Sequence, residues 1–470
     1  MDAIERWAAA VRSRRERAAA AWQLRSELVV VPAGIPIPIA GTDQFHEFHA
    51  HPEHYYLAGV ADPGGVLTFD ATEGWTYFAP VVTLEEAVWT GPGRPLDEYA
   101  ARTGLATVRP VSEFANWLER KRGRTVALLG NDDITRAPEG YRLPGWAEFE
   151  LALDTTLSAR LREAVDVLRR RKDAEELERI RRAVAASIEG HRLALRLARP
   201  GMTERELQVE LEAEFFRRGG DRTAYSSIVG SGPNGATLHV SPSRRALLDG
   251  DLVLIDAGAE VEGYASDITR TFPAGRRFTG VQRDLYQLVL DVQRWAIATA
   301  APGVDYRDLH LGASRRLAEG LQQLGFLRGG LDAILERDAQ ALFFPHGLGH
   351  LLGLATHDAG GCIPARPRPD RPSLRYLRLD APLEPGFVVT IEPGIYFIPA
   401  LLDDPAIRRR YAEEVDWGRV DALRGFGGIR IEDDVLVTET GVEVLSAALP
   451  KDIDAIEALR SEAPRSWTGS

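Results

Sequence analysis

Residues 252–269, LVLIDAGAEVEGYASDIT, decide the fold of the larger part of this chain. Two apolar runs flank a connection that contains Gly258 and Gly263, a pattern typical of a β-hairpin. Asp256 and Asp267 lie almost symmetrically about that connection, so both can project from one sheet face, where cross-strand Cβ atoms are about 4.5–5.5 Å apart. Carboxylates that close raise each other's pKa unless a cation lies between them. A solvated hairpin with two turn aspartates remains the alternative for this stretch alone.

A second segment, residues 343–358 (FFPHGLGHLLGLATHD), gathers three of the ten histidines. They are His346, His350 and His357, and the glycines between them permit close approach of the backbone to a neighbouring group. A single histidine in apolar surroundings is usually a hydrogen-bonded core residue. Three within twelve residues, beside glycines, favour a functional site instead.

Two later strand-like segments each carry a glutamate. In residues 388–396 (VVTIEPGIY), Glu392 ends an apolar run and precedes a proline, so a buried carboxylate there needs a partner or a metal. In residues 427–437 (GGIRIEDDVLV), alternation places Arg430 and Glu432 on the same strand face. Taken alone, the second segment is an ordinary strand with a salt-bridging face.

Together these segments predict one metal centre. Four carboxylates balance the charge of two divalent cations, and a single imidazole completes the set; the expected ligands are Asp256, Asp267, His350, Glu392 and Glu432. Oxygen ligands with one nitrogen suit Mn²⁺, Co²⁺, Zn²⁺ or Fe²⁺ and disfavour copper. Two such ions about 3.5–4 Å apart acidify a bridging water, which becomes a hydroxide nucleophile. Glu392 is expected to take and return its proton.

Composition limits the class of protein. The chain has 470 residues, enough for two or three domains, and 44% apolar with 27% charged residues is typical of a soluble globular protein. A formal charge of −12 argues against a nucleic-acid partner. The single cysteine, Cys362, excludes an internal disulfide, and no apolar run reaches the roughly 18 residues of a membrane span. We therefore expect a cytoplasmic protein without membrane or nucleic-acid partners.

The chain is expected to divide into an N-terminal α/β domain (1–165) and an α+β domain (166–470). In the first, residues 1–22 form an amphipathic helix, 28–31, 65–69, 76–78 and 125–129 read as strands, and 84–88 and 111–120 read as helices. Residues 161–172 form a helix that leads into the second domain. The basic run Arg169–Lys172 at its end is interpreted as a solvated helix face.

The second domain is predicted to hold a curved, mainly antiparallel sheet with helices outside. Asp173 with Glu176 begins a helix that Pro200-Gly201 ends, and Thr203 with Glu206 begins another, which ends at Gly219-Gly220. Further helices are expected at 282–299 and 306–324. The expected strands are 226–229, 252–256, 264–272, 388–392 and 428–437.

Two patterns are weighed and set aside. Residues 230–235 (GSGPNG) match the GxGxxG dinucleotide pattern, and Asp256 follows at a suitable spacing, but Pro242 lies where the required helix should run. The histidine cluster His46, His49, His51 and His54 lacks the spacing of a zinc-binding helix, and its aromatic neighbours favour a partly buried loop.

Residues 173–450 resemble the pita-bread metallopeptidases, the family of methionine aminopeptidase, aminopeptidase P and prolidase. The resemblance is carried by the stretches IDAG and SDITRTF, PHGLGHLLGLATHD, TIEPGIYF and GFGGIRIEDDVLVT. Five ligands in the order Asp, Asp, His, Glu, Glu make it specific. Residues 1–165 resemble the creatinase-type domain that precedes the catalytic domain in prolidases and aminopeptidases P.

The resemblance implies a role for each site residue. Asp256 would bind one metal, Asp267 and Glu432 would bridge, and His350 and Glu392 would bind the other, with Glu392 as the proton shuttle. The remaining implied catalytic and substrate-binding residues are His239, His346, His357, Arg430 and Tyr225. One departure is that residues 240–245 (VSPSRR) lack the tyrosine and extra residues common after the histidine that His239 matches.

The expected function is that of an Xaa-Pro dipeptidase with two divalent ions, manganese first, acting as a homodimer. Arg378 resembles the prolidase arginine that caps the dipeptide carboxylate, with a surface loop arginine as its alternative. Trp89 resembles a residue that reaches a partner's active site, while a buried core tryptophan is the simpler interpretation. The alternatives are an aminopeptidase P, which cleaves longer Xaa-Pro peptides, a non-catalytic peptide-binding module, and a phosphotriester side activity.

Overall fold

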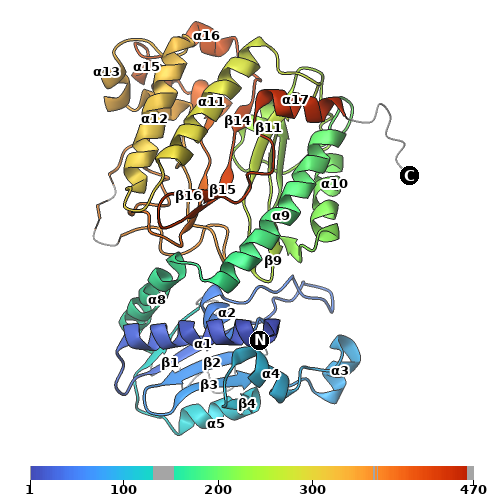
Figure 1. Cartoon of the computed structure of the whole chain (residues 1–470), viewed down its shortest axis with the longest axis vertical. Helices are drawn as coiled ribbons and strands as arrows, with labels where there is room; N and C mark the ends of the chain where they lie inside the picture. The colour runs from blue at the N-terminus through green and yellow to red at the C-terminus, as the bar shows by residue number, and fades with distance from the viewer. Residues whose placement is uncertain (1, 131–152, 364–365, 368, 463–470) are drawn as a thin grey trace. The chain divides into compact units, whose positions relative to one another are not determined.

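The computed structural model describes residues 2–130, 153–363, 366–367 and 369–462 (Figure 1). The chain divides into two compact units, Met1–Arg169 and Arg170–Ser470. The boundary expected from the sequence, between residues 165 and 166, falls inside helix α8 (Thr155–Arg170), near this division. Among the described residues, no helix combines the length and apolar character needed to cross a bilayer.

The first unit is built on a five-stranded mixed sheet in the order β4-β3-β2-β1-β5. Its elements are α1 (Ala3–Trp22), β1 (Leu28–Pro32), α2 (Pro52–Ala58), β2 (Val66–Asp70), β3 (Gly74–Ala79), α3 (Leu84–Thr90), α4 (Leu96–Thr103), β4 (Val108–Pro110), η1 (Val111–Glu113), α5 (Phe114–Glu119) and β5 (Val126–Leu128). The four expected strands are present. Helices α2 and α4 and strand β4 were not predicted, because each is too short to show a clear periodicity.

Both faces of this sheet are covered. Successive side chains of a strand point to opposite faces, and these strands carry apolar side chains on both. On one face, Val30 and Phe78 pack with Trp117 of α5 in a buried core cluster. On the other face, Phe69 and Trp75 pack against Trp22 at the end of α1, with ring centroids 5.8 and 5.5 Å away. The β-branched and aromatic content of these strands therefore reflects burial on both sides.

The second unit contains short antiparallel sheets with helices outside, as expected. Its helices are α9 (Ala174–Leu197), α10 (Glu204–Arg217), α11 (Gly280–Thr299), α12 (Tyr306–Gln323), α13 (Leu331–Glu336), α14 (Pro399–Leu402), α15 (Pro405–Arg410), α16 (Trp417–Asp421) and α17 (Ile453–Ser461), with the 3-10 turns η3 (Gly232–Ala236) and η4 (Ala339–Leu342). Its strands are β6 (Arg222–Thr223), β7 (Ile228–Ser231), β8 (Leu252–Asp256), β9 (Ala259–Val261), β10 (Tyr264–Ala265), β11 (Thr269–Pro273), β12 (Val388–Ile391), β13 (Gly394–Tyr396), β14 (Gly428–Arg430), β15 (Asp433–Val437) and β16 (Val442–Val444).

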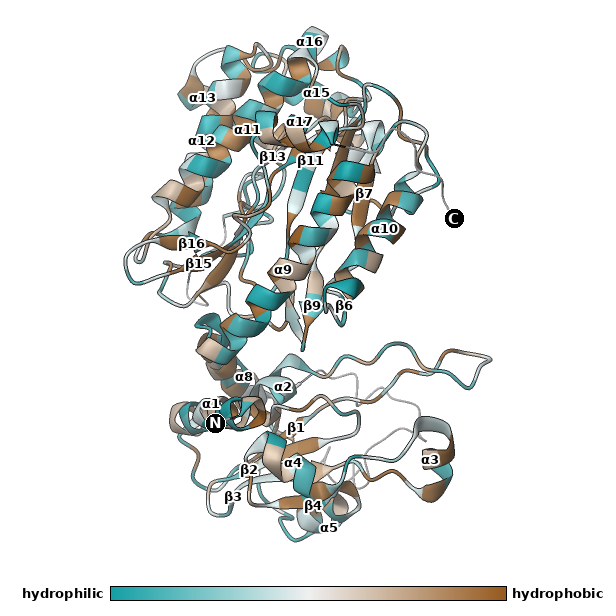
Figure 2. Cartoon of the chain, turned by 45° about the vertical axis from the view of Figure 1, so that its right-hand side comes forward, coloured by the Kyte–Doolittle hydropathy of each residue, from teal (hydrophilic) through white to brown (hydrophobic). Residues whose placement is uncertain are grey.

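Local sequence signals begin the helices that cover these sheets. The Asp173 side chain accepts hydrogen bonds from the backbone N–H groups of Glu175 and Glu176, and the Glu176 carboxylate accepts one from the backbone N–H of Asp173. Thr203 and Glu206 form the same reciprocal cap at α10. Both predicted capping boxes are confirmed. Helix α9 carries both hydrophobic and hydrophilic residues (Figure 2), and its buried residues Ile180, Val184 and Ile188 recur at helical spacing, which fits a helix with one buried face.

The basic run Arg169–Lys172 is only partly solvated: the predicted solvated face was wrong for Arg169 and Lys172, whereas Arg171 is exposed. Arg169 is buried, and the Lys172 side chain is only 1% exposed. The Lys172 ammonium donates to the Asp358 carboxylate at 2.9 Å, across 186 residues of sequence. Burial of two charges is tolerated because each is the partner of the other. The pair attaches the start of the second unit to the end of the histidine segment.

Removing one member of this buried pair should be costly. We predict that Lys172→Met lowers the free energy of unfolding of the second unit by about 3–5 kcal/mol, because Asp358 is left as an uncompensated buried charge. The control is Arg171→Met. Arg171 is 63% exposed and pairs with Glu384 at the surface, so its loss should cost under about 1 kcal/mol. Urea denaturation measures both, and equal small effects would contradict the prediction.

Candidate metal centre and active site

The first two candidate ligands are held by the predicted hairpin. Asp256 ends β8, which pairs antiparallel with β11, and Asp267 lies two residues before β11. The connection turns at Glu262 and Gly263, with φ of 47° and 81°, the positive values of a type I′ hairpin turn. The Tyr225 hydroxyl lies 2.5 Å from an oxygen of each aspartate. The two carboxylates therefore share one small space, as the symmetric spacing predicted.

Strand pairing brings the other three candidates to the same place. The Glu432 backbone donates to Thr269 at 3.1 Å, which joins β11 to the segment before β15. Strand β15 pairs with β12, so Glu392, directly after β12, lies beside Glu432. Residues 348–352 continue the ladder along β12 through hydrogen bonds between His350 and Thr390 and between Glu392 and Leu348. The five residues come together because one run of antiparallel ladders connects them.

Close backbone contact explains the glycine before His350. A Cβ atom at Gly349 would lie 2.1 Å from the Thr390 carbonyl and 2.3 Å from the Tyr306 hydroxyl. Any side chain there would push the histidine segment away from β12. The expected close approach is thus present at Gly349, between its backbone and that of β12.

The geometry suits a cation. Asp267, His350 and Glu432 are buried and offer ligand atoms that all lie within 4.8 Å of one another. His350 Nδ1 lies 3.0 Å from the Leu351 carbonyl, which can only accept, so Nδ1 carries the proton. The lone pair of Nε2 then faces Asp267 Oδ2 at 3.4 Å and Glu392 Oε1 at 3.8 Å. A lone pair that faces carboxylate oxygens is repelled by them unless a positive ion lies between. In metal-binding histidines, the ring nitrogen that does not bind the metal typically donates a hydrogen bond, as Nδ1 does here.

The pKa values of the four carboxylates also indicate a cation-binding site. Burial, and then the neighbouring carboxylate, raise the pKa of Asp267 and of Glu432 well above their usual values. Burial together with Glu432 raises the pKa of Glu392 to about 8. Burial also acts to raise the pKa of Asp256, but Arg430 and Tyr225 outweigh it and hold that pKa below its usual value. A cluster of like charges in a water-poor site is the situation that divalent cations relieve. The residues present therefore fit a divalent metal.

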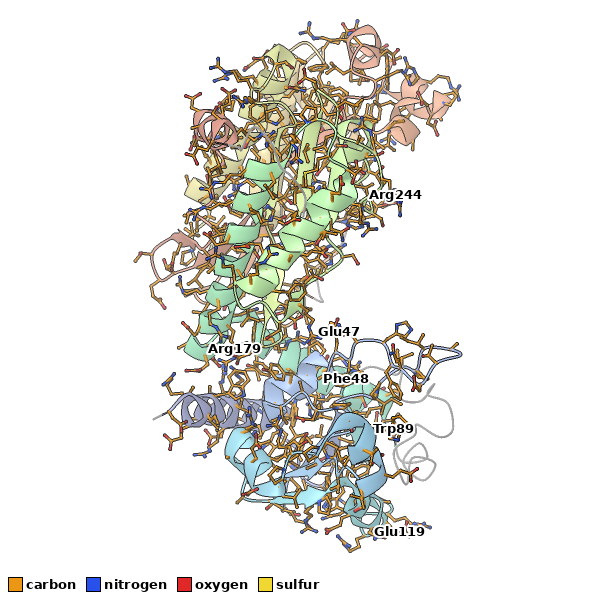
Figure 3. The ribbon with its side chains drawn as sticks, turned by 90° about the vertical axis from the view of Figure 1, so that its right-hand side faces the viewer. Glu47, Phe48, Trp89, Glu119, Arg179 and Arg244 are labelled. Carbon is orange, nitrogen blue, oxygen red and sulfur yellow. The ribbon has the colours of Figure 1, made fainter. Side chains whose placement is uncertain are left out.

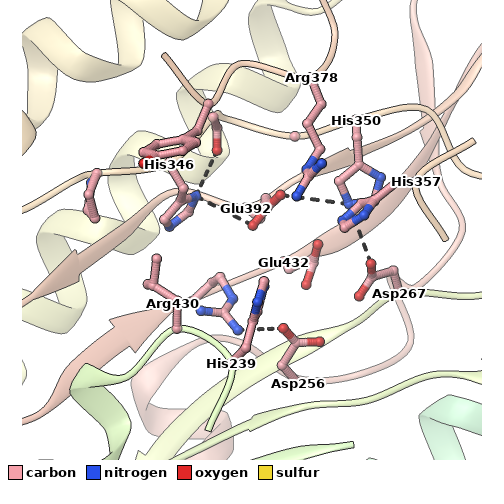
Figure 4. A pocket seen from close by; sticks show the side chains of 15 residues that line it. His239, Asp256, Asp267, His346, His350, His357, Arg378, Glu392, Arg430 and Glu432 are labelled. Atoms are coloured by element: carbon pink, nitrogen blue, oxygen red, sulfur yellow. Dashed lines mark hydrogen bonds and ion pairs between the residues drawn. The ribbon is translucent and has the colours of Figure 1, made fainter. Parts of the chain in front are cut away.

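A cavity of about 290 Å³ opens onto these ligands (Figure 4). Every expected metal ligand lines it, together with His239, His346, His357, Arg378 and Arg430. His239, His357 and Arg378 are exposed residues, whereas Arg430 is buried. The cavity thus has a buried carboxylate floor and a rim of basic side chains on loops. Its volume matches a ligand of dipeptide size.

A hydrogen-bonded chain joins Arg430 to His346 through Tyr396, a residue that sequence reasoning did not select. Arg430 Nη1 donates to the Tyr396 hydroxyl at 2.6 Å, and that hydroxyl lies 3.0 Å from His346 Nε2. Nε2 accepts the proton of the Tyr396 hydroxyl, because the ring proton of His346 is on Nδ1. Nδ1 donates this proton to the Gly347 carbonyl, which can only accept, at 2.8 Å. That nitrogen lies 3.6 Å from Glu392. Burial, followed by the charge of Arg430, lowers the pKa of His346 to about 3, so its ring is neutral.

Arg430 itself is oriented by the site. Its Nη2 donates to Asp256, and its Nε donates to Thr269 at 3.1 Å. Thr269 also donates to Glu432 at 2.6 Å. Thr269 was missed because a threonine in a strand looks like any other β-former. The sequence contained one signal for Thr269: it lies two residues after Asp267, and side chains two residues apart in a strand point to the same face.

Two further candidates are Tyr225, which lies beside the candidate ligands, and Trp89, which does not line the cavity. Tyr225 contacts Asp256 and Asp267 through its hydroxyl, so in this structure it lies against candidate ligands. Trp89 lies on α3 of the first unit (Figure 3) and is 79% exposed. The interpretation of Trp89 as a buried core residue was therefore wrong.

Comparison with known proteins assigns the family. Residues 178–439 match the model of metallopeptidase family M24, and residues 11–127 match that of the aminopeptidase P N-terminal domain. The chain belongs to metallopeptidase family M24. This assignment confirms the expected fold class, an N-terminal creatinase-type domain followed by a pita-bread domain, and the expected enzyme class.

The relatives of this M24 chain include both kinds of Xaa-Pro peptidase. Human Xaa-Pro dipeptidase is 35% identical over 450 residues, which cover 94% of this chain and 90% of that protein. A probable Xaa-Pro aminopeptidase of Aspergillus niger is 34% identical over 434 residues, 90% of each chain. The structure of Pseudomonas aeruginosa aminopeptidase PepP superposes with a TM-score of 0.81 at 31% identity, covering 97% of this chain and 98% of that one. Aminopeptidase P from E. coli with the inhibitor Pro-Leu gives 0.78 at 30% identity, with 97% and 98% covered.

The metal content of the protein, measured without any substrate, tests the candidate ligands directly. We predict that Glu432→Gln lowers the divalent metal content after Mn²⁺ loading and desalting, because an amide is a weaker ligand and carries no charge. Elemental analysis measures the ions per chain. Glu443→Gln, on exposed strand β16, is the matched control and should retain wild-type content. Equal metal content in the two variants would contradict a role for Glu432 as a ligand.

Proposed function

We propose that the chain is an Xaa-Pro dipeptidase that uses two divalent cations, manganese first, held by Asp256, Asp267, His350, Glu392 and Glu432. The observation that carries this proposal is the convergence of four carboxylates and a neutral imidazole on one cavity. Both the dipeptidase and aminopeptidase relatives act on Xaa-Pro substrates by name, which supports the proline preference. Two divalent ions bound here would acidify a water molecule and polarise the scissile carbonyl group.

The residues of the chain supply orientation and proton transfer. Glu392 lies between His350 and His346, so its carboxylate can accept a proton from an attacking water and return it to the leaving nitrogen. His346 donates its Nδ1 proton to the Gly347 carbonyl at 2.8 Å, and Nδ1 lies 3.6 Å from Glu392, so the ring places a partial positive charge beside the carboxylate that transfers the proton. Burial and the charge of Arg430 keep His346 neutral, and the Gly347 carbonyl fixes its tautomer. His239 and His357 lie at the rim, where they can contact the substrate.

Arg378 favours a dipeptide over a longer peptide. It lines the cavity, and among the described residues no acidic side chain forms an ion pair with it. A guanidinium group in that state suits the terminal carboxylate of a substrate, which it can bind in a bidentate manner. A longer peptide has an uncharged amide at this point and must continue past the arginine. Aminopeptidase P activity on longer peptides remains the second candidate, because relatives of that name are equally similar.

The choice is tested by comparing turnover of Gly-Pro with that of Arg-Pro-Pro by the Mn²⁺-loaded protein. We expect efficient cleavage of the dipeptide only. Arg378→Ala should then raise KM for Gly-Pro at least tenfold and leave the slow tripeptide reaction unchanged, since an ion pair to a carboxylate is worth about 1.5–3 kcal/mol.

The matched control is Arg375→Ala, which removes an arginine of the same loop that pairs with Asp370 at 3.2 Å. It should leave both KM values near wild type. Efficient tripeptide cleavage with an inert dipeptide would instead establish the aminopeptidase. Inertness toward both peptides, in protein that retains its metal, would favour a non-catalytic peptide-binding role.

We further propose a homodimer that uses the apolar face of α3. Leu84, Val88 and Trp89 are 77–88% exposed on this short helix, and Val81 precedes it with 55% exposed. Contiguous exposed apolar side chains of this size are typical of an interaction surface. In light scattering, Val88→Ser with Trp89→Ser should shift the mass from two chains to one. Val209→Ser, a similarly exposed valine on α10, should have no effect; a wild-type protein of single-chain mass would contradict the dimer.

A further inference from the structure

Glu204 is a buried carboxylate that the proposed reaction does not use. It is the first residue of α10 and is fully buried, yet it does not line the catalytic cavity. Burial of an ionised carboxylate is unfavourable unless hydrogen bonds compensate for the lost hydration. The partners of Glu204 therefore indicate what it stabilises.

Three residues donate hydrogen bonds to this carboxylate. Ser231 donates its backbone N–H and its hydroxyl to Oε1, at 2.8 and 2.7 Å. Ser243 does the same to Oε2, at 3.1 and 2.6 Å, and the Asn234 amide nitrogen lies 3.0 and 3.1 Å from the two oxygens. Burial acts to raise the pKa of Glu204, but the hydrogen bonds from Ser243, Ser231 and Asn234 hold that pKa below its usual value.

These donors mark both ends of one segment. Ser231 ends β7, Asn234 lies in the turn η3, and Ser243 closes the segment before it pairs with the start of α10. Between them lie Leu238 and His239, which both line the catalytic cavity. The glycine-rich motif at residues 230–235, which resembled a dinucleotide fingerprint, is thus the binding loop for a carboxylate of the protein itself.

The segment is also confined on its other sides. A Cβ atom at Gly230 would lie 2.9 Å from the Val240 side chain, and one at Gly428 would lie 2.5 Å from the Gly235 carbonyl. Gly428 begins β14, the strand that carries Arg430. The segment therefore lies between the carboxylate of Glu204 and the strand of the active-site arginine.

His239 depends on this backbone for its position. Its side chain is exposed, and the hydrogen bonds found among the described residues include none from its ring. Its neighbours Leu238 and Val240 pack against the buried cluster of Ile228, Leu254 and Tyr396. Because the His239 ring makes none of these hydrogen bonds, the imidazole points into the cavity only while residues 231–243 keep their conformation (Figure 4).

We propose that Glu204 is a positioning residue that holds His239 over the metal centre by tying together both ends of residues 231–243. The substrate that His239 meets there is the Xaa-Pro peptide of the proposed function, on which this part of the inference rests. Glu204 acts through the segment and touches neither substrate nor metal.

A double-mutant cycle tests the coupling. In Glu204→Gln, the amide NH2 cannot accept, so the donors of Ser231 or Ser243 lose their acceptor. We expect kcat/KM for Gly-Pro to fall about tenfold in this variant, but less than twofold when the same change is made in His239→Ala, because the two changes remove one shared contribution. Mn²⁺ content should stay at the wild-type value. Equal losses in both backgrounds, or loss of metal, would overturn the proposal.

Glu206→Gln is the matched control. It makes the same chemical change in the same helical turn, at an exposed carboxylate that caps Thr203. We expect wild-type kcat/KM and no coupling to His239→Ala. A tenfold loss here as well would show that any weakening of the start of α10 suffices, and would overturn a specific role for Glu204.

Hydrogen exchange gives a readout that does not depend on activity. The amide protons of Ser231 and Ser243 are bonded to Glu204, so Glu204→Gln should increase their exchange at least tenfold, while residues 252–256 exchange as in the wild type. Unchanged exchange would overturn the proposal. A wild-type protein inert toward Xaa-Pro peptides would refute the proposed function alone, since exchange still decides whether Glu204 orders the His239 segment.

Discussion

The mutual repulsion of the buried carboxylates at the centre of the second unit is the constraint on which the rest of that unit depends. Asp256, Asp267 and Glu432 are each less than a tenth exposed, and Glu392 lies beside them. Gathering like charges away from water is strongly unfavourable, so the backbone must hold them there. It does so with antiparallel ladders that stop at the candidate ligands: Asp256 ends β8, and Glu392 and Glu432 lie just outside β12 and β15. Each side chain is free to turn inward where its strand ends.

The residues next to the ligands serve this constraint in different ways. Asp433 forms a buried ion pair with Arg270 and also pairs with Lys451, and Arg270 donates to the Glu432 carbonyl at 2.7 Å. Asp434 accepts the backbone N–H of Asp267 at 3.1 Å. Three consecutive acidic residues therefore serve as a candidate ligand, as the centre of an ion-pair network and as a backbone acceptor. Their differences come from the partners that the fold brings to them.

This explains which parts were predictable from the sequence. The hairpin of Asp256 and Asp267, the capping boxes and the longer strands were predictable because alternation, turn glycines and helix caps are local signals. The connection of Tyr396 to His346 and the burial of Lys172 were not, because each depends on a partner far along the chain. Lys172 illustrates the error: a run of basic residues at a helix end resembles a solvated face until Asp358 is found beside it.

Reaction chemistry and substrate choice also depend on different parts of the unit. The candidate ligands are fixed by ladders of buried strands, whereas His239, His357 and Arg378 are exposed and lie on connecting segments. A change in a loop can therefore alter the shape of the cavity rim without disturbing the positions of the candidate ligands. This separation accounts for the near-equal similarity of the chain to a dipeptidase and to an aminopeptidase, at 35% and 34% identity. Whole-chain identity mainly reports the shared scaffold and does not separate the two activities, so the proposed preference for a dipeptide depends on rim residues such as Arg378, which lines the cavity.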